Sequence, residues 1–166
     1  MQKSNNKFID NRIQLDNTIR NYWNKIHTEN LVPKNYVRQY DLKEIFNKIK
    51  ESAEERAIVK LKLLCINFGF KKFSELPKDS IQLDIFKLSE LTEIKKQLEK
   101  VKTLNPVLKA KKGKKNLNRT EALTSNWIKA RIKELDLEIL AIQDKLTKFN
   151  DNIEFDDATA PMCLAA

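Results

Sequence analysis

The apolar residues between positions 128 and 149 recur at alternating spacings of four and three residues. A repeat of this kind places every member on one side of an α-helix, and it is typical of a coiled-coil seam. A second apolar stripe, which includes Leu123, Trp127 and Leu137, widens that face, so we expect the helix to contact two neighbours. The spacing predicts a long last helix over about 120–149, capped by Asn118 or Thr120. Its seam comprises Ile128, Ile132, Leu135, Ile139, Ile142, Leu146 and Phe149.

Helical spacing also covers most of the preceding chain. It predicts one helix over 5–29, a second that begins at Asp41, a third that begins at Ser52 and a fourth over about 80–104. Asp41 and Ser52 are each followed three residues later by a glutamate, which is the capping-box signature. Gly69 follows the third helix and suits a left-handed C-terminal cap. With only two glycines and four prolines, the chain is poor in turn residues, so we predict an all-α fold rather than a β-sandwich or barrel.

These helices suggest three regions within the 166 residues. We predict an N-terminal helical bundle over 1–78, packed on a long antiparallel, coiled-coil-like helical hairpin over 79–149. The tip of the hairpin would lie at about 106–119. Residues 150–166 contain four acidic residues and no basic one, and we expect them to form a flexible acidic tail.

Positive charge is concentrated in residues 95–133, which carry thirteen basic and two acidic residues, a net charge of +11. The whole chain has a net charge of +9, so the remaining residues together are slightly acidic. A surplus this localised makes a patch of positive potential. We predict a non-catalytic nucleic-acid-binding accessory protein that contacts the backbone phosphates of DNA or RNA. The candidate contact residues are Lys109, Lys111, Lys112, Lys114, Lys115, Arg119, Lys129, Arg131 and Lys133.

Other interpretations of the same residues stay open. The lysine-rich tip could be a solvated turn, or its partner could be an acidic protein or an anionic lipid. The rival function is a protein–protein interaction module, such as an adaptor, an inhibitor or a structural subunit. In that case the seam over 128–149 could join two copies into a homo-oligomer. Trp127 could stack on a base, but its position in the apolar stripe favours a place in the core.

The sequence contains no motif for catalysis or for a cofactor, so we expect no enzyme activity and no cofactor. His27 is the only histidine and has no ligand-type pattern around it, so no metal site is predicted. Cys65 lies in an apolar run and is expected to be buried, and two distant cysteines favour a reducing, cytoplasmic location. No apolar run is long enough to span a membrane, so we expect no membrane partner. The C-terminal Cys163-Leu-Ala-Ala fits a prenylation pattern and resembles a bacterial degradation tag, although acidic residues precede it.

Overall fold

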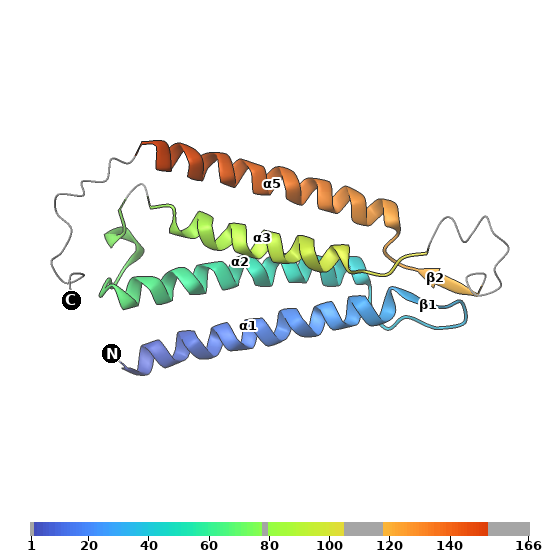
Figure 1. Cartoon of the computed structure of the whole chain (residues 1–166). Helices are drawn as coiled ribbons and strands as arrows, with labels where there is room; N and C mark the ends of the chain where they lie inside the picture. The colour runs from blue at the N-terminus through green and yellow to red at the C-terminus, as the bar shows by residue number, and fades with distance from the viewer. Residues whose placement is uncertain (1, 78–79, 105–117, 153–166) are drawn as a thin grey trace, which may run out of the picture.

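The computed structural model describes residues 2–77, 80–104 and 118–152 (Figure 1). Most of these residues are helical, which confirms the predicted helical fold class. The four long helices are α1 (Gln2–Glu29), α2 (Leu42–Asn67), α3 (Gln82–Glu99) and α5 (Ser125–Asp151). A 3-10 turn, η1 (Phe73–Glu75), lies in the connection between α2 and α3. None of the helices in the described part of the chain combines the length and apolar character that crossing a membrane requires.

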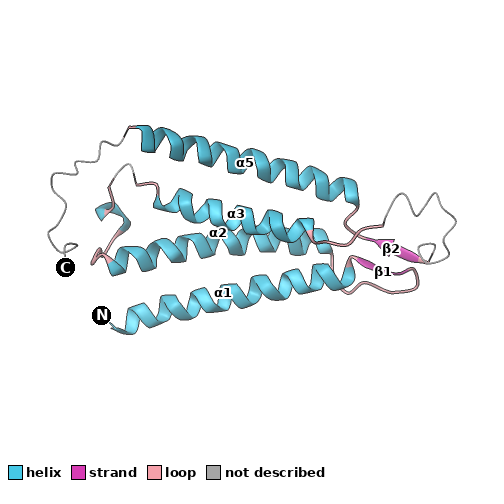
Figure 2. Ribbon diagram, viewed as in Figure 1, coloured by secondary structure: helices cyan, strands magenta, loops and turns pink. Residues whose placement is uncertain are grey.

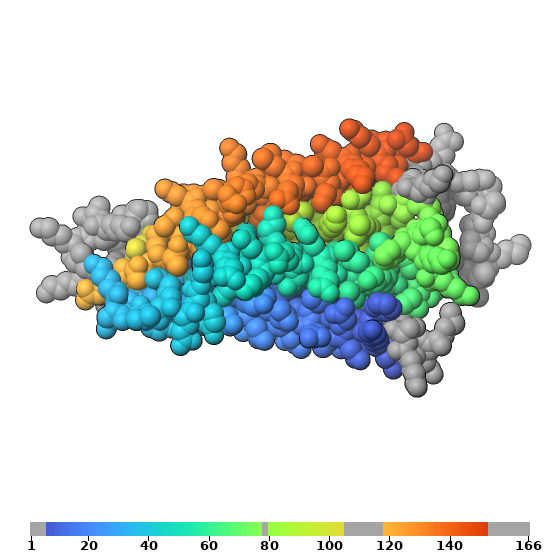
Figure 3. Space-filling view, turned by 180° about the vertical axis from the view of Figure 1, so that it is seen from behind, coloured from blue at the N-terminus to red at the C-terminus, as the bar shows by residue number. Residues whose placement is uncertain are grey.

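Successive helices run in opposite directions along an elongated molecule (Figure 1). α1 packs against α2, α2 against α3, and α3 against α5. The face in Figure 3 shows α2 between α1 and α5, with part of α3 visible behind α2 and α5. α1, α2 and α5 contain 28, 26 and 27 residues, so each spans about 40 Å, whereas α3 has only 18.

One hydrophobic core joins the four helices. It contains residues from α1 and α2 as well as from α3 and α5, and therefore crosses residue 78. The division into an N-terminal bundle over 1–78 and a hairpin over 79–149 stays a prediction. Residues 153–166 of the predicted acidic tail lie outside the described residues. The buried core residues are Ile19, Trp23, Ile26, Leu42, Ile45, Phe46, Ile49, Ala53, Ile94, Leu98, Val101, Leu123, Ile128 and Leu135.

α2 is one continuous helix, so the prediction that a new helix begins at Ser52 was wrong. The capping signature around Ser52 lies in the middle of α2, where the backbone N–H groups already have partners within the helix. Ala53 and Ala57, one turn apart, are both buried, and small side chains at these positions let neighbouring helices approach. Burial of this face therefore outweighs a local capping preference.

The ends of α2 follow their local sequence. The Asp41 carboxylate accepts the backbone N–H groups of Lys43 and Glu44, at 2.8 and 3.4 Å, and so forms the predicted N-cap. At the other end, Gly69 has φ +80°, and the N–H of Phe70 donates to the carbonyl oxygen of Cys65 at 2.8 Å. This is a Schellman motif, which needs a left-handed residue after the cap. The predicted roles of Asp41 and Gly69 are confirmed.

α5 begins later than the sequence indicates. Its N-cap is Thr124, whose Oγ1 accepts the N–H of Trp127 at 3.2 Å, and neither Asn118 nor Thr120 caps it. Thr120 instead lies in an extended strand, because its backbone pairs with that of Val32. Within the seam, Ile128 and Leu135 are buried in the core of their own chain, and the remaining members are partly buried. A homo-oligomer through this seam stays a prediction.

Two short strands pair at one end of the molecule (Figure 2). β1 (Leu31–Pro33) and β2 (Arg119–Glu121) are antiparallel, with Leu31 opposite Glu121 and Pro33 opposite Arg119. We did not predict this sheet, since three-residue strands carry no detectable alternation. The strands bring together two segments that are far apart in the sequence, and they lie at the end of the molecule where α3 ends and α5 begins.

Candidate nucleic-acid interface

We call the end of the molecule that contains β1, β2 and residues 34–41 the strand end. Asn30, the residue between α1 and β1, holds three segments together there, and it is only 1% exposed. Its Nδ2 donates to the carbonyl oxygens of Lys102 (2.9 Å) and Leu123 (3.1 Å), and its Oδ1 accepts the N–H of Leu123 (2.6 Å). Its own carbonyl oxygen accepts the N–H of Ala122 at 3.2 Å. A buried amide satisfied in this way fixes the relative positions of the segments that it joins.

Arg38 adds a second cross-link at the same end. Its Nε donates to the carbonyl oxygen of Glu29 at 3.1 Å, and its Nη2 donates to those of Asn30 (3.1 Å) and Thr120 (2.9 Å). A cation is favourable at this position because the carbonyl groups at the end of α1 carry partial negative charge. Arg38 therefore holds residues 34–41 against both α1 and β2.

The strand end also holds the two described residues that flank the lysine-rich positions 105–117. The N–H of Leu104 donates to Oε2 of Glu121 at 2.5 Å. The carbonyl oxygen of Asn118 accepts the N–H of Lys34 at 2.9 Å. Leu104 and Asn118, the described residues on either side of positions 105–117 with their five lysines, therefore lie at the same end of the molecule.

The predicted contact residues divide into two groups. Five of them lie outside the described residues, namely Lys109, Lys111, Lys112, Lys114 and Lys115. The other four lie in β2 or in the first turns of α5, at or near the strand end. Arg119 is exposed in β2 and lies opposite Pro33.

Lys129 and Lys133 are exposed and one turn apart on α5, so they share a face of the helix. Arg131 points to a different face and is only partly exposed. Its Nη2 forms an ion pair with Glu134 at 2.5 Å, and its guanidinium lies 5.8 Å from the ring centroid of Trp127. The structure therefore brings Lys129 and Lys133 together but does not place Arg131 with them.

The lysines near the end of α3 also divide into side chains that are paired with a carboxylate and side chains that are not. Lys95 forms an ion pair with Asp136 of α5 at 2.7 Å, and the hydrogen bond and charge of that carboxylate raise the pKa of Lys95. Within the described residues, eight other cations at or near this end are exposed, with no carboxylate oxygen within 4.0 Å. These eight are Lys34, Lys43, Lys96, Lys100, Lys102, Arg119, Lys129 and Lys133. Among the described residues at this end, they are the charges that are available to an anionic partner.

Lys34 belongs to this group although the sequence analysis did not include it. It stands 61 residues before Lys95, where the most basic part of the chain begins. Only the pairing of β1 with β2 places it beside Asn118 and Arg119. No local pattern around residue 34 could have identified it, because the pairing partner is remote in sequence.

Trp127 packs against the core, as its place in the apolar stripe favours. Its ring meets Phe46 edge to face, with a centroid distance of 5.3 Å and an interplanar angle of 84°. His27 occupies the last turn of α1, where it stacks on Trp23 at 5.8 Å and its Nε2 lies 3.3 Å from Oε1 of Gln97. In the described ranges, no group of three or more His, Cys, Asp or Glu side chains could hold a metal ion.

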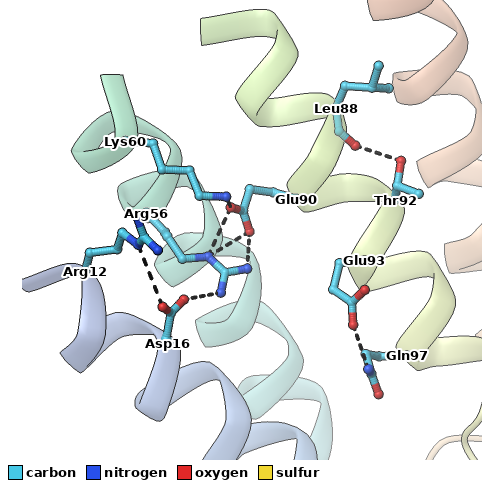
Figure 4. A network of polar contacts seen from close by, with 9 residues as sticks. All are labelled: Arg12, Asp16, Arg56, Lys60, Leu88, Glu90, Thr92, Glu93 and Gln97. Carbon is cyan, nitrogen blue, oxygen red and sulfur yellow. Dashed lines mark hydrogen bonds and ion pairs between the residues drawn. The ribbon is translucent and has the colours of Figure 1, made fainter. Parts of the chain in front are cut away.

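A second concentration of charge lies in the middle of the helices and is internally paired (Figure 4). Glu90 of α3 is only 3% exposed; its carboxylate accepts hydrogen bonds from Arg56 and from Lys60, the latter at 2.7 Å. Arg56 also donates to Asp16 of α1 at 2.6 Å. Burial alone would lower the pKa of Arg56, but its bonds with Glu90 and Asp16 outweigh burial and raise it. These charges join α1, α2 and α3 and leave little net charge for a partner.

None of the family models, curated proteins and solved structures compared with the chain matches it. The arrangement at the strand end is therefore interpreted from its own residues.

Proposed function

We propose that the protein binds nucleic acid without catalysis and that the strand end contacts backbone phosphates. One observation supports this above all: the two positions that flank the basic residues 105–117 are hydrogen-bonded to the same end of the molecule. Eight exposed cations without a carboxylate partner among the described residues lie at or near that end. A regularly spaced polyanion is the kind of partner that a surface of this charge attracts.

The chemistry of the surface predicts how it would bind. Seven of the eight cations are lysines, which meet phosphates as mobile point charges and carry little information about base sequence. Binding would be driven mainly by release of counterions from the nucleic acid, so it should weaken steeply with salt. The hydrogen bonds of Asn30 and Arg38 fix the surface around the flanking positions before the partner arrives, which lowers the entropy cost of binding.

A salt titration of the full chain tests the proposal. Fluorescence anisotropy with a labelled oligonucleotide should give an affinity that falls with salt, at a slope of log K against log salt of roughly −4.5 for about five phosphate contacts. The double variant Lys129→Gln, Lys133→Gln should reduce that slope by roughly 2 if each lysine contacts one phosphate. A matched control is Lys71→Gln, Lys72→Gln, which removes the same charge from exposed residues between α2 and α3.

The outcomes separate this function from its alternatives. Equal losses in the two double variants would mean that net charge alone sets the affinity, which contradicts a site at the strand end. The variant Lys111→Gln, Lys112→Gln, Lys114→Gln, Lys115→Gln tests the tip, and unchanged affinity would remove these residues from the site. Poly-glutamate added as a competitor distinguishes an acidic protein partner, because it should displace the oligonucleotide poorly if phosphates are the preferred ligand.

A protein–protein interaction module is the second candidate, and a different observation favours it. Leu137 and Leu140 on α5 are 62% and 53% exposed, which is unusual for two large apolar side chains so close together. If α5 joins two copies, sedimentation equilibrium should give a dimer for the natural sequence and a monomer for Leu137→Gln, Leu140→Gln. A monomer in both cases would contradict this self-association.

A further inference from the structure

Residues 34–41 expose an aromatic side chain on a loop that is held in place. Tyr36 is 41% exposed and its neighbour Val37 is 84% exposed. The N–H of Tyr36 donates to the carbonyl oxygen of Pro33 at 3.0 Å, and Arg38 donates to the carbonyl oxygens of Glu29 in α1, of Asn30 and of Thr120 in β2. The two exposed residues therefore lie between fixed points, so that an exposed ring can meet a ligand at little cost in entropy.

Two unpaired cations belong to the backbone segments next to Tyr36. Lys34 precedes Tyr36 by two residues in the turn that follows β1. Arg119 lies opposite Pro33 in the sheet, and Lys34 bonds through its N–H to the residue before Arg119. Within the described residues, neither Lys34 nor Arg119 has a carboxylate oxygen within 4.0 Å. An exposed aromatic residue on backbone segments that also carry two unpaired cations can combine a stacking surface with phosphate contacts.

From this juxtaposition we propose that the strand end selects single-stranded nucleic acid, with a base stacked on Tyr36 and the adjacent phosphates bound by Lys34 and Arg119. The inference rests on the proposed nucleic-acid binding and specifies its substrate class. In a duplex, neighbouring base pairs cover the faces of each base, so a protein ring has no face to stack on. In a single strand every base can present its π-face, and such stacking is tolerant of sequence.

Tyr36 is a better stacking residue than the other aromatic side chains at this end. Lys25 Nζ lies 4.1 Å from the ring centroid of Tyr40, so a cation already covers one face of that ring. Trp127 meets Phe46 at its edge and packs against the core. Tyr36 forms no aromatic or cation–π pair of this kind among the described residues.

The test compares substitutions at Tyr36 on two probes. The probes are a labelled oligo(dT) strand, which forms no stable secondary structure, and a duplex with the same number of phosphates. Tyr36→Ala should lower the affinity for oligo(dT) by at least about fivefold and leave the affinity for the duplex nearly unchanged. Tyr36→Phe keeps the π-face and should bind like the natural sequence, whereas Tyr36→Leu keeps apolar area without the π-face and should bind like Tyr36→Ala. Val37→Ala is the control for a change in the same loop.

Each outcome supports or overturns the inference. Weaker binding of oligo(dT) by Tyr36→Ala and Tyr36→Leu, and by no other variant, supports stacking. Equal binding of all variants to oligo(dT) overturns the inference while phosphate binding stands, and equal losses on both probes overturn it as well. If the natural sequence shows no salt-dependent binding to either probe, the proposed function itself fails. Far-ultraviolet circular dichroism and urea unfolding confirm that each variant is folded, as expected for an exposed loop residue.

Discussion

The strongest prediction concerns Asn30, which holds the strand end together. Asn30→Ala removes three hydrogen bonds, from Nδ2 to the carbonyl oxygens of Lys102 and Leu123 and from the N–H of Leu123 to Oδ1. Asn30 is 1% exposed and Leu123 is fully buried, so water cannot readily replace the lost partners at Leu123. The carbonyl of Lys102 is easier for water to reach, because Lys102 is exposed.

At about 1 kcal/mol for each hydrogen bond, the three bonds contribute about 3 kcal/mol to the free energy of unfolding. This is a large part of the roughly 5–15 kcal/mol that stabilises a typical domain. Asn30→Asp should be at least as damaging. It keeps an acceptor for the N–H of Leu123 but places a second carboxylate oxygen opposite two carbonyl oxygens.

Urea unfolding measures the global effect, and hydrogen exchange measures the local one. A loss of about 3 kcal/mol should accelerate exchange of the Leu123 amide by roughly a hundredfold if opening is local to the strand end. Asn24→Ala is the matched control, because Asn24 is exposed on α1, the helix that ends just before Asn30, and it should change stability by less than about 0.5 kcal/mol. An Asn30→Ala protein as stable as the control, with unchanged exchange at Leu123, would refute the role assigned to Asn30.

Three further predictions concern the helices. Glu90→Gln should lower the free energy of unfolding, measured with urea, by about 3 kcal/mol, because it leaves the partly buried Arg56 and Lys60 without their shared carboxylate. Glu99→Gln at an exposed position is the control, and equal stability of the two variants would contradict this reasoning. Gly69→Ala should cost about 1–2 kcal/mol by the same measurement, since φ is +80° and a new Cβ meets no atom within 4 Å that would add a clash; an unchanged midpoint would argue against strain at this cap. Burial raises the pKa of Cys65, so less thiolate is present at any given pH. In a Cys163→Ser variant at about pH 8, iodoacetamide should therefore label Cys65 more slowly in the folded protein than in urea, and equal rates would show that the thiol is accessible.

Local sequence patterns determined the helical character of the chain and several helix ends. The seam over 128–149 predicted α5, and Asp41 and Gly69 mark the two ends of α2 because their interactions reach only two to five residues along the chain. The buried position of Cys65 was likewise visible in its apolar surroundings. The concentration of basic residues over 95–133 is a matter of composition, so it could also be read directly from the sequence.

The tertiary structure decided which local signals took effect and which remote segments came together. The capping signature at Ser52 is overridden in α2, where Ala53 and Ala57 are buried. The strand register, the buried amide of Asn30 and the place of Lys34 beside Asn118 depend on contacts between segments such as residues 30 and 123, which are 93 positions apart. Periodicity and capping describe interactions within about one helical turn, so they carry no information about such pairs. The charge of the candidate interface was thus determined by the sequence, whereas the arrangement of its exposed cations arose only when the helices packed.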